Sequence, residues 1–121
     1  MRVTLFTDLN CPFCYSTEQR LERLGVSGQV AWRGVEHEPE LPVPMARDDL
    51  EIAAELAAEV EAVRSRAPEV AIAVPPGKAN AAAGLLAAAA ALRVDAGRGA
   101  AFRQAVSVSY THLTLPTTPY V

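Results

Sequence analysis

Residues 3–15 decide how this chain folds, and they read VTLFTDLNCPFCY. The first five, residues 3–7, are mostly β-branched or aromatic and favour a short buried strand, which runs into a polar turn. A helix is predicted to begin at Pro12, because proline suits the first helical position. Cys11 and Cys14 therefore stand where a strand gives way to a helix.

The next elements complete a strand–helix–strand unit. The helix is expected to cover residues 12–24, since Gly25 suits its C-terminal cap. A second strand is expected over residues 29–36, where Val30 and Trp32 lie on one side of an alternating pattern. Such a unit has parallel strands and a right-handed crossover, so the sequence predicts an α/β fold.

The middle of the chain is expected to be helical. Residues 39–44 contain three prolines and predict an extended linker, because proline cannot donate to a sheet ladder. Asp48 as N-cap, with Glu51 reaching back, predicts a helix that ends at about Arg66. Later apolar stretches predict two more helices, over residues 79–94 and 100–106. The whole helical insertion is expected to cover residues 45–106.

The last fifteen residues, 107–121, differ in composition from the rest. They contain no acidic, Lys, Arg or Ala residue. From Val108 onward they resemble the translation of a sequencing adapter, and we expect a non-native tail in place of a missing native C-terminal part. The alternative is a genuine Thr-rich disordered tail.

The composition of the chain argues against several classes of function. The chain has 121 residues and a net charge of −3, with no basic cluster, which argues against an electrostatic nucleic-acid binder. The longest apolar stretch is too short to span a bilayer. A strand begins almost at once, without a secretory signal, so we expect a cytoplasmic protein with no membrane partner. In that compartment, two cysteines three positions apart are catalytic or metal-binding.

The cysteine spacing suits thiol–disulfide exchange. A thiolate is the attacking species, and the start of a helix lowers a thiol's pKa because its free N–H groups and dipole favour negative charge. We expect Cys11 to be the more exposed and more acidic thiol, and Cys14, one turn later, to be shielded and within reach of it. Pro12 fixes the helix entry.

The motif Cys11-Pro12-Phe13-Cys14-Tyr15 after its strand resembles the active-site segment of DsbA-like thioredoxin-fold disulfide oxidoreductases, specifically the FrnE type. Residues 2–106 follow that pattern. The resemblance implies a thioredoxin-like βαβ unit over residues 1–44, a helical insertion, and a nucleophilic Cys11 with Cys14 as resolving thiol. Pro12 and Phe13 would support the active-site loop. Partners would be protein or small-molecule thiols and disulfides, with no cofactor.

In the family, a later β-hairpin presents a cis-proline beside the nucleophile, and nothing here matches it. Three alternatives therefore remain beside the oxidoreductase: an inactive fragment of such an enzyme, a glutathione-dependent isomerase or transferase relative, and a CxxC metal-binding module. Cys11 disfavours the second, which usually has serine there. Two thiols are only half of a tetrahedral zinc site, and neither His37 nor His112 has ligand spacing, so we expect no metal.

Other polar and aromatic residues are given structural roles. Phe13 and Tyr15 are expected to pack beside the motif, Trp32 to be a core strand residue, and His37 to be exposed or hydrogen-bonded. Glu51, Glu55 and Glu59 are expected to form a solvent-facing stripe on their helix. Lys78 is expected to lie in a loop, and Asn80 to cap a helix.

Overall fold

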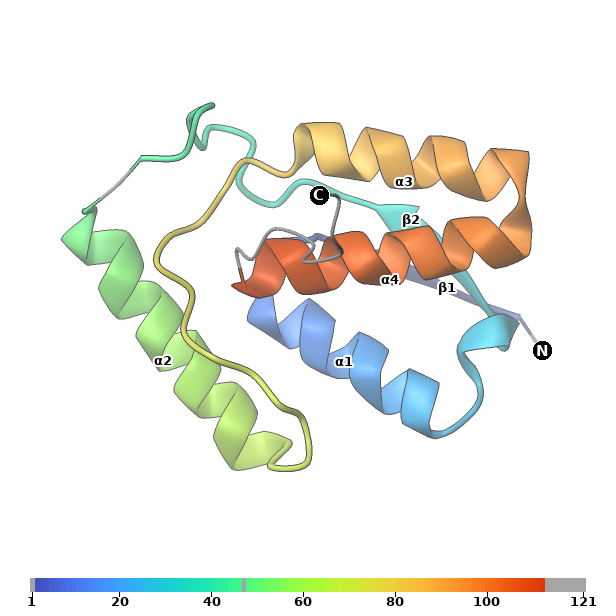
Figure 1. Ribbon diagram of the computed structural model, residues 1–121. Coiled ribbons are helices and arrows are strands. Elements are labelled where there is room, and N and C mark those ends of the chain that lie inside the picture. Colours follow the sequence, from blue (N-terminus) through green and yellow to red (C-terminus); the bar gives the residue numbers. More distant parts are fainter. Residues whose placement is uncertain (1, 47, 113–121) are drawn as a thin grey trace, which may run out of the picture.

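The computed structural model describes residues 2–46 and 48–112, which form a mixed α/β fold with two parallel strands and four α-helices (Figure 1). Strands β1 (Val3–Thr7) and β2 (Val30–Gly34) pair with Val3 opposite Val30. Helix α1 (Pro12–Arg23) and the short 3₁₀ turn η1 (Ser27–Gln29) connect them. The expected strand–helix–strand order is confirmed, although β2 is shorter than residues 29–36.

Helix α1 begins and ends where its sequence indicates. Pro12 occupies the first turn, where its missing N–H costs nothing. Gly25 follows the C-cap residue Leu24 and has φ +73°, a left-handed conformation that glycine adopts without a steric penalty. Arg20 and Arg23 lie in the last turn and complement the negative end of the helix dipole.

Helix α2 (Leu50–Arg66) has a different N-cap from the one expected. Asp48 has φ +60°, whereas an N-cap residue needs extended backbone. Asp49 has φ −82° and ψ 105°, and its carboxylate accepts hydrogen bonds of 3.1 Å from the backbone N–H groups of Glu51 and Ile52. The predicted N-cap is therefore wrong by one residue, and the capping box is wrong as well, because Ile52 rather than Glu51 occupies the third helical position.

The last two helices also differ from their predicted bounds. Helix α3 (Ala82–Val94) begins three residues later than expected, and its N-cap residue is Ala81, which makes no side-chain cap hydrogen bond. Asn80, expected to be the cap, lies one residue earlier and accepts from the N–H of Ala82. Helix α4 (Ala96–His112) begins before residue 100, because Asp95 caps it through the N–H of Arg98, and it also continues past residue 106. Residues 107–112 of the expected tail therefore continue α4, and residues 113–121 lie outside the described residues.

The helices gather on one face of the sheet (Figure 1). Helices α3 and α4 run side by side, α4 also contacts α1, and α2 packs against the other side of α1. Leu5 and Thr7 point to the covered face of β1, whereas Phe6, on the opposite face, is 63 % exposed. No described helix is long and apolar enough to cross a membrane.

The main hydrophobic cluster lies between α1, α2 and the loop after α2. Tyr15, which was expected to pack beside the cysteine motif, belongs to this cluster. Val60 and Val63 contribute the buried side of α2, and the loop that follows adds further apolar side chains. The members of the cluster are Tyr15, Val60, Val63, Ala67, Val70 and Ile72.

Candidate redox site at the start of helix α1

The two cysteines sit at the N-terminus of α1, as the sequence predicts, and both are free thiols. Cys11 is the N-cap residue, with extended backbone at φ −114° and ψ 112°. Its Sγ accepts a hydrogen bond of 3.3 Å from the backbone N–H of Cys14. The sulfur thus occupies the place that a serine or aspartate oxygen takes at other helix starts, where negative charge is stabilised.

The electrostatics distinguish the two thiols. Hydrogen bonding from the Cys14 thiol and backbone, together with the charge of His37 and the N–H of Phe13, outweighs burial and lowers the pKa of Cys11 to about 7. The hydrogen bond to Cys11, burial and the charges of Cys11 and Glu18 raise the pKa of Cys14 above its ordinary value. Near neutral pH, Cys11 is the thiol that ionises.

Exposure does not distinguish them. Both cysteines are half-buried, so the expectation of an exposed Cys11 beside a shielded Cys14 is not met. The difference in acidity comes chiefly from the hydrogen bond between the two thiols, and the backbone N–H of Cys14, which the Cys11 sulfur accepts at the helix N-cap, adds to it.

Pro12, Phe13 and Tyr15 differ in burial and in the side chains that they contact. Pro12 is fully buried, which fixes the path into the helix. Phe13 is 40 % exposed, and the Arg66 guanidinium lies 6.0 Å from its ring centroid. Tyr15 is buried and meets the His112 ring edge-on at 5.2 Å. Phe13 therefore offers an apolar surface beside the thiols rather than a core contact.

The turn before the cysteines is anchored by distant segments. Asn10 donates through Nδ2 to the carbonyl of Ala79 at 2.7 Å. Asp8, which is buried, accepts from the backbone N–H of His37 at 2.9 Å and contacts its Nδ1. These contacts hold the loop that presents Cys11, and sequence spacing could not reveal them because the partners are 29 and 69 residues away.

A chain of charges continues from Asp8 away from the thiols. His37 Nε2 lies 3.0 Å from Glu38, whose carboxylate accepts from Lys78 Nζ at 2.6 Å. Lys78 is 1 % exposed and also faces Glu55 and Glu59. Glu59 was expected to face solvent, and this prediction is wrong. Its side chain is only 21 % exposed, because it faces the buried ammonium of Lys78. His37 is hydrogen-bonded, as expected.

A second buried polar cluster joins α1 to α4. Glu18 accepts from Arg103 at 2.8 Å and from Ser107 Oγ at 2.8 Å. The Arg103 guanidinium carbon lies 3.7 Å from the ring centroid of Trp32. This cluster was missed, because Arg103 and Ser107 were assigned to a short helix and a tail with no role.

Comparison with known proteins finds no matching family model, no similar curated protein and no similar solved structure. The assignment of chemistry therefore depends on the geometry of the site. The part of the chain that the structure describes contains no group of three or more His, Cys, Asp or Glu side chains arranged to hold a metal ion.

Proposed function

We propose that this chain is a thiol–disulfide oxidoreductase of the DsbA-like, thioredoxin-fold class, acting in the cytoplasm. The observation that carries the proposal is the Cys11 sulfur at the N-cap of α1, accepting the N–H of Cys14. The lowered pKa of Cys11 and the raised pKa of Cys14 support a division of labour between attacking and resolving thiols.

The reaction follows from that division. The Cys11 thiolate attacks one sulfur of a substrate disulfide, forms a mixed disulfide with it and displaces the other sulfur as a thiolate. Cys14 then loses its proton and attacks the Cys11 sulfur, which releases the second substrate thiolate. Two electrons pass to the substrate, and Cys11 and Cys14 become a disulfide. The reverse sequence oxidises a substrate dithiol.

The test traps the mixed disulfide. Incubating the Cys14→Ser variant with glutathione disulfide should yield one glutathione adduct on Cys11, detected by intact mass and peptide mapping. The Cys11→Ser variant is the matched control and should form far less adduct, because the remaining thiol has a raised pKa. Equal adducts on both variants, or an adduct on Cys14 alone, would contradict the assignment of roles.

The reduction potential gives an independent measurement. Phe13 carries no positive charge that could stabilise a neighbouring thiolate, so Cys11 depends on the helix terminus and its surroundings. We expect a potential between roughly −270 and −120 mV, the range set by thioredoxin and DsbA. Equilibration of the intact chain with glutathione buffers measures it, and a value outside that interval would contradict this expectation.

A further inference from the structure

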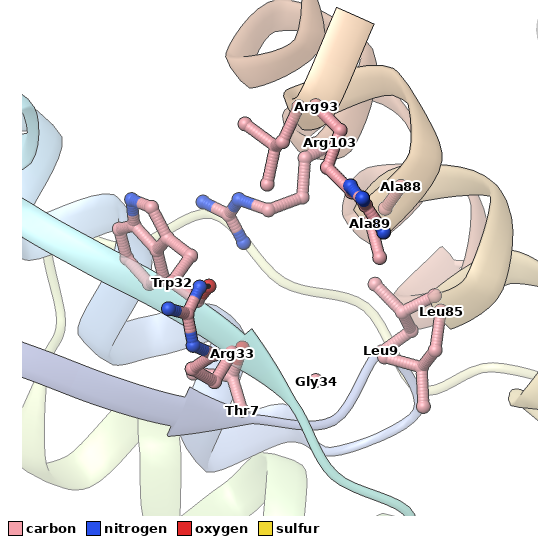
Figure 2. A pocket seen from close by; sticks show the side chains of 11 residues that line it. Thr7, Leu9, Trp32, Arg33, Gly34, Leu85, Ala88, Ala89, Arg93 and Arg103 are labelled. Carbon is pink, nitrogen blue, oxygen red and sulfur yellow. Dashed lines mark hydrogen bonds between the residues drawn. The ribbon is translucent and has the colours of Figure 1, made fainter. Parts of the chain in front are cut away.

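A cavity of about 260 Å³ lies between β2, the turn after β1 and the paired helices α3 and α4. Figure 2 shows Trp32, Arg33 and Arg103 together on one side of it and Leu9 and Leu85 on the other. Leu9 and Ala88 are buried and form rigid parts of the wall. Neither cysteine is among the described residues that line the cavity, so its chemistry is separate from thiol exchange.

The lining is cationic. It includes three arginines, Arg33, Arg93 and Arg103, and no acidic side chain from the described part of the chain. Arg103 forms a salt bridge with Glu18, whereas Arg33 and Arg93 form no salt bridge with a described carboxylate. An anion placed in this cavity would therefore meet an uncompensated positive field.

Arg103 is a fixed part of the cavity wall. Its side chain is 6 % exposed, and its Nε has no hydrogen-bond partner among the described residues. The Trp32 ring, 3.7 Å from the guanidinium carbon, holds the group in place by a cation–π contact.

The volume of the cavity and its apolar walls indicate the size and the apolar character of the rest of the ligand. An apolar cavity of about 150 Å³ holds a benzene molecule, so about 260 Å³ is enough for one ring with a charged substituent but not for a nucleotide. The Leu9, Leu85 and Ala88 side chains offer an apolar surface to the ring. Guanidinium groups match the planar, two-oxygen geometry of a carboxylate.

We propose that this cavity binds a small monocarboxylate with an apolar body, of the size of a single aromatic ring. The carboxylate lies toward Arg93 and Arg103, and the ring lies between Trp32 and the leucines. This binding site is independent of the redox pair, and it goes beyond the proposed function.

Trp32 is the single tryptophan of the chain, so its fluorescence reports directly on the cavity. Benzoate added to the full chain should change that fluorescence saturably. Benzyl alcohol, with the same ring but no charge, and acetate, with the charge but no ring, should each bind at least about tenfold more weakly, because each loses one half of the recognition. Equal responses to benzoate and benzyl alcohol, or no saturation, would overturn the proposal.

Variants locate the site without disturbing the buried Glu18–Arg103 pair. Arg93→Gln should weaken benzoate binding about tenfold, the loss expected for one charge-assisted hydrogen bond. Ala89→Leu, at an exposed lining position, should also weaken it by filling the cavity. Arg98→Gln, an exposed arginine of α4 outside the cavity, is the matched control and should bind like the parent, as should the Cys11→Ser variant. Unchanged binding in both Arg93→Gln and Ala89→Leu would overturn the proposed site.

Discussion

At the scale of single residues, the reactivity of Cys11 depends on its neighbours. His37 matters most among the groups that the motif does not contain. Burial opposes a charge on His37, but the hydrogen bond and the charge of Asp8 outweigh it and raise the pKa of the imidazole. The resulting positive charge is one of the causes that lower the pKa of Cys11. Asp8 thus acts on Cys11 indirectly, by holding His37 in place and by favouring its charged form.

The first prediction concerns the pH profile of Cys11. Because its pKa is lowered to about 7, the rate of alkylation by limiting iodoacetamide should rise with pH through about 7, and peptide mapping should find Cys11 labelled before Cys14. Replacing His37 with Gln removes a favourable charge, so the midpoint should move upward and the rate at pH 7 should fall about threefold.

His112→Gln is the control for this prediction, since His112 is not among the groups that shift the pKa of Cys11. Its profile should match the parent. A His37→Gln profile that also matches the parent would show that the Asp8–His37 pair has only a structural role.

At the scale of secondary-structure elements, α3 and α4 approach each other closely at one glycine. A Cβ on Gly99 would lie 2.5 Å from the carbonyl oxygen of Ala91 and 2.6 Å from the Cα of Leu92, both backbone atoms of α3 that cannot move aside cheaply. Two residues earlier, a Cβ on Gly97 would meet only Asp95 Oδ1, at 3.7 Å. The two glycines therefore differ in what they contribute: Gly99 permits the packing, and Gly97 only weakens the helix.

The second prediction compares these two positions. Gly99→Ala should lower the free energy of unfolding by about 1 to 3 kcal/mol, because overpacking pushes the helices apart. Gly97→Ala, in the exposed first turn of the same helix, should raise it by about 0.5 kcal/mol through helix propensity. Urea denaturation followed by circular dichroism measures both. A Gly99→Ala variant as stable as Gly97→Ala would be incompatible with the close approach of α3 and α4.

At the scale of the whole molecule, Lys78 connects segments that are distant in sequence. Its ammonium meets Glu38 from the stretch after β2, and Glu55 and Glu59 from α2. Burial works against the charge on Lys78, but these three carboxylates outweigh it and raise its pKa. The ammonium therefore keeps its charge at neutral pH and loses it only in strong base, whereas acid weakens these ion pairs by protonating the carboxylates.

The third prediction removes that cation. Lys78→Met should cost about 3 to 5 kcal/mol at pH 7, because the three carboxylates then lose their buried ammonium and only Glu38 keeps a neighbouring cation, His37. Burial already raises the pKa of Glu59, and losing Lys78 should raise it further. A carboxyl whose folded pKa is raised destabilises the fold above its unfolded pKa, and this penalty is relieved as pH falls through the folded pKa.

The stability deficit of Lys78→Met should accordingly shrink between pH 7 and pH 5, measured by urea denaturation at both values. Lys78→Arg is the control that keeps the charge, and its deficit should be smaller and should not shrink on acidification. A deficit of Lys78→Met that is the same at both pH values would mean that it comes from lost packing rather than from the carboxylates.

The amino-acid sequence by itself was enough to place Cys11 and Cys14 at a helix start between two parallel strands. Those features depend on local rules: β-branched runs, a proline at the first helical turn and a glycine after the last. Helix bounds were less accurate where two similar residues competed, as with Asp48 and Asp49, or where Asp95 capped a helix that was expected to begin only at residue 100.

Only the tertiary structure decided which polar residues meet around the cysteines. His37, Lys78 and Arg103 lie 29, 40 and 85 residues from Asp8, Glu38 and Glu18, and no spacing rule connects such pairs. Their charges are buried because neighbouring elements bring opposite charges to them, which a single sequence does not reveal. The motif thus predicts where the proposed exchange would take place and supplies the largest pKa shifts of its own thiols. The packing of distant segments adds the charge of His37 beside Cys11 and determines the charge of the cavity.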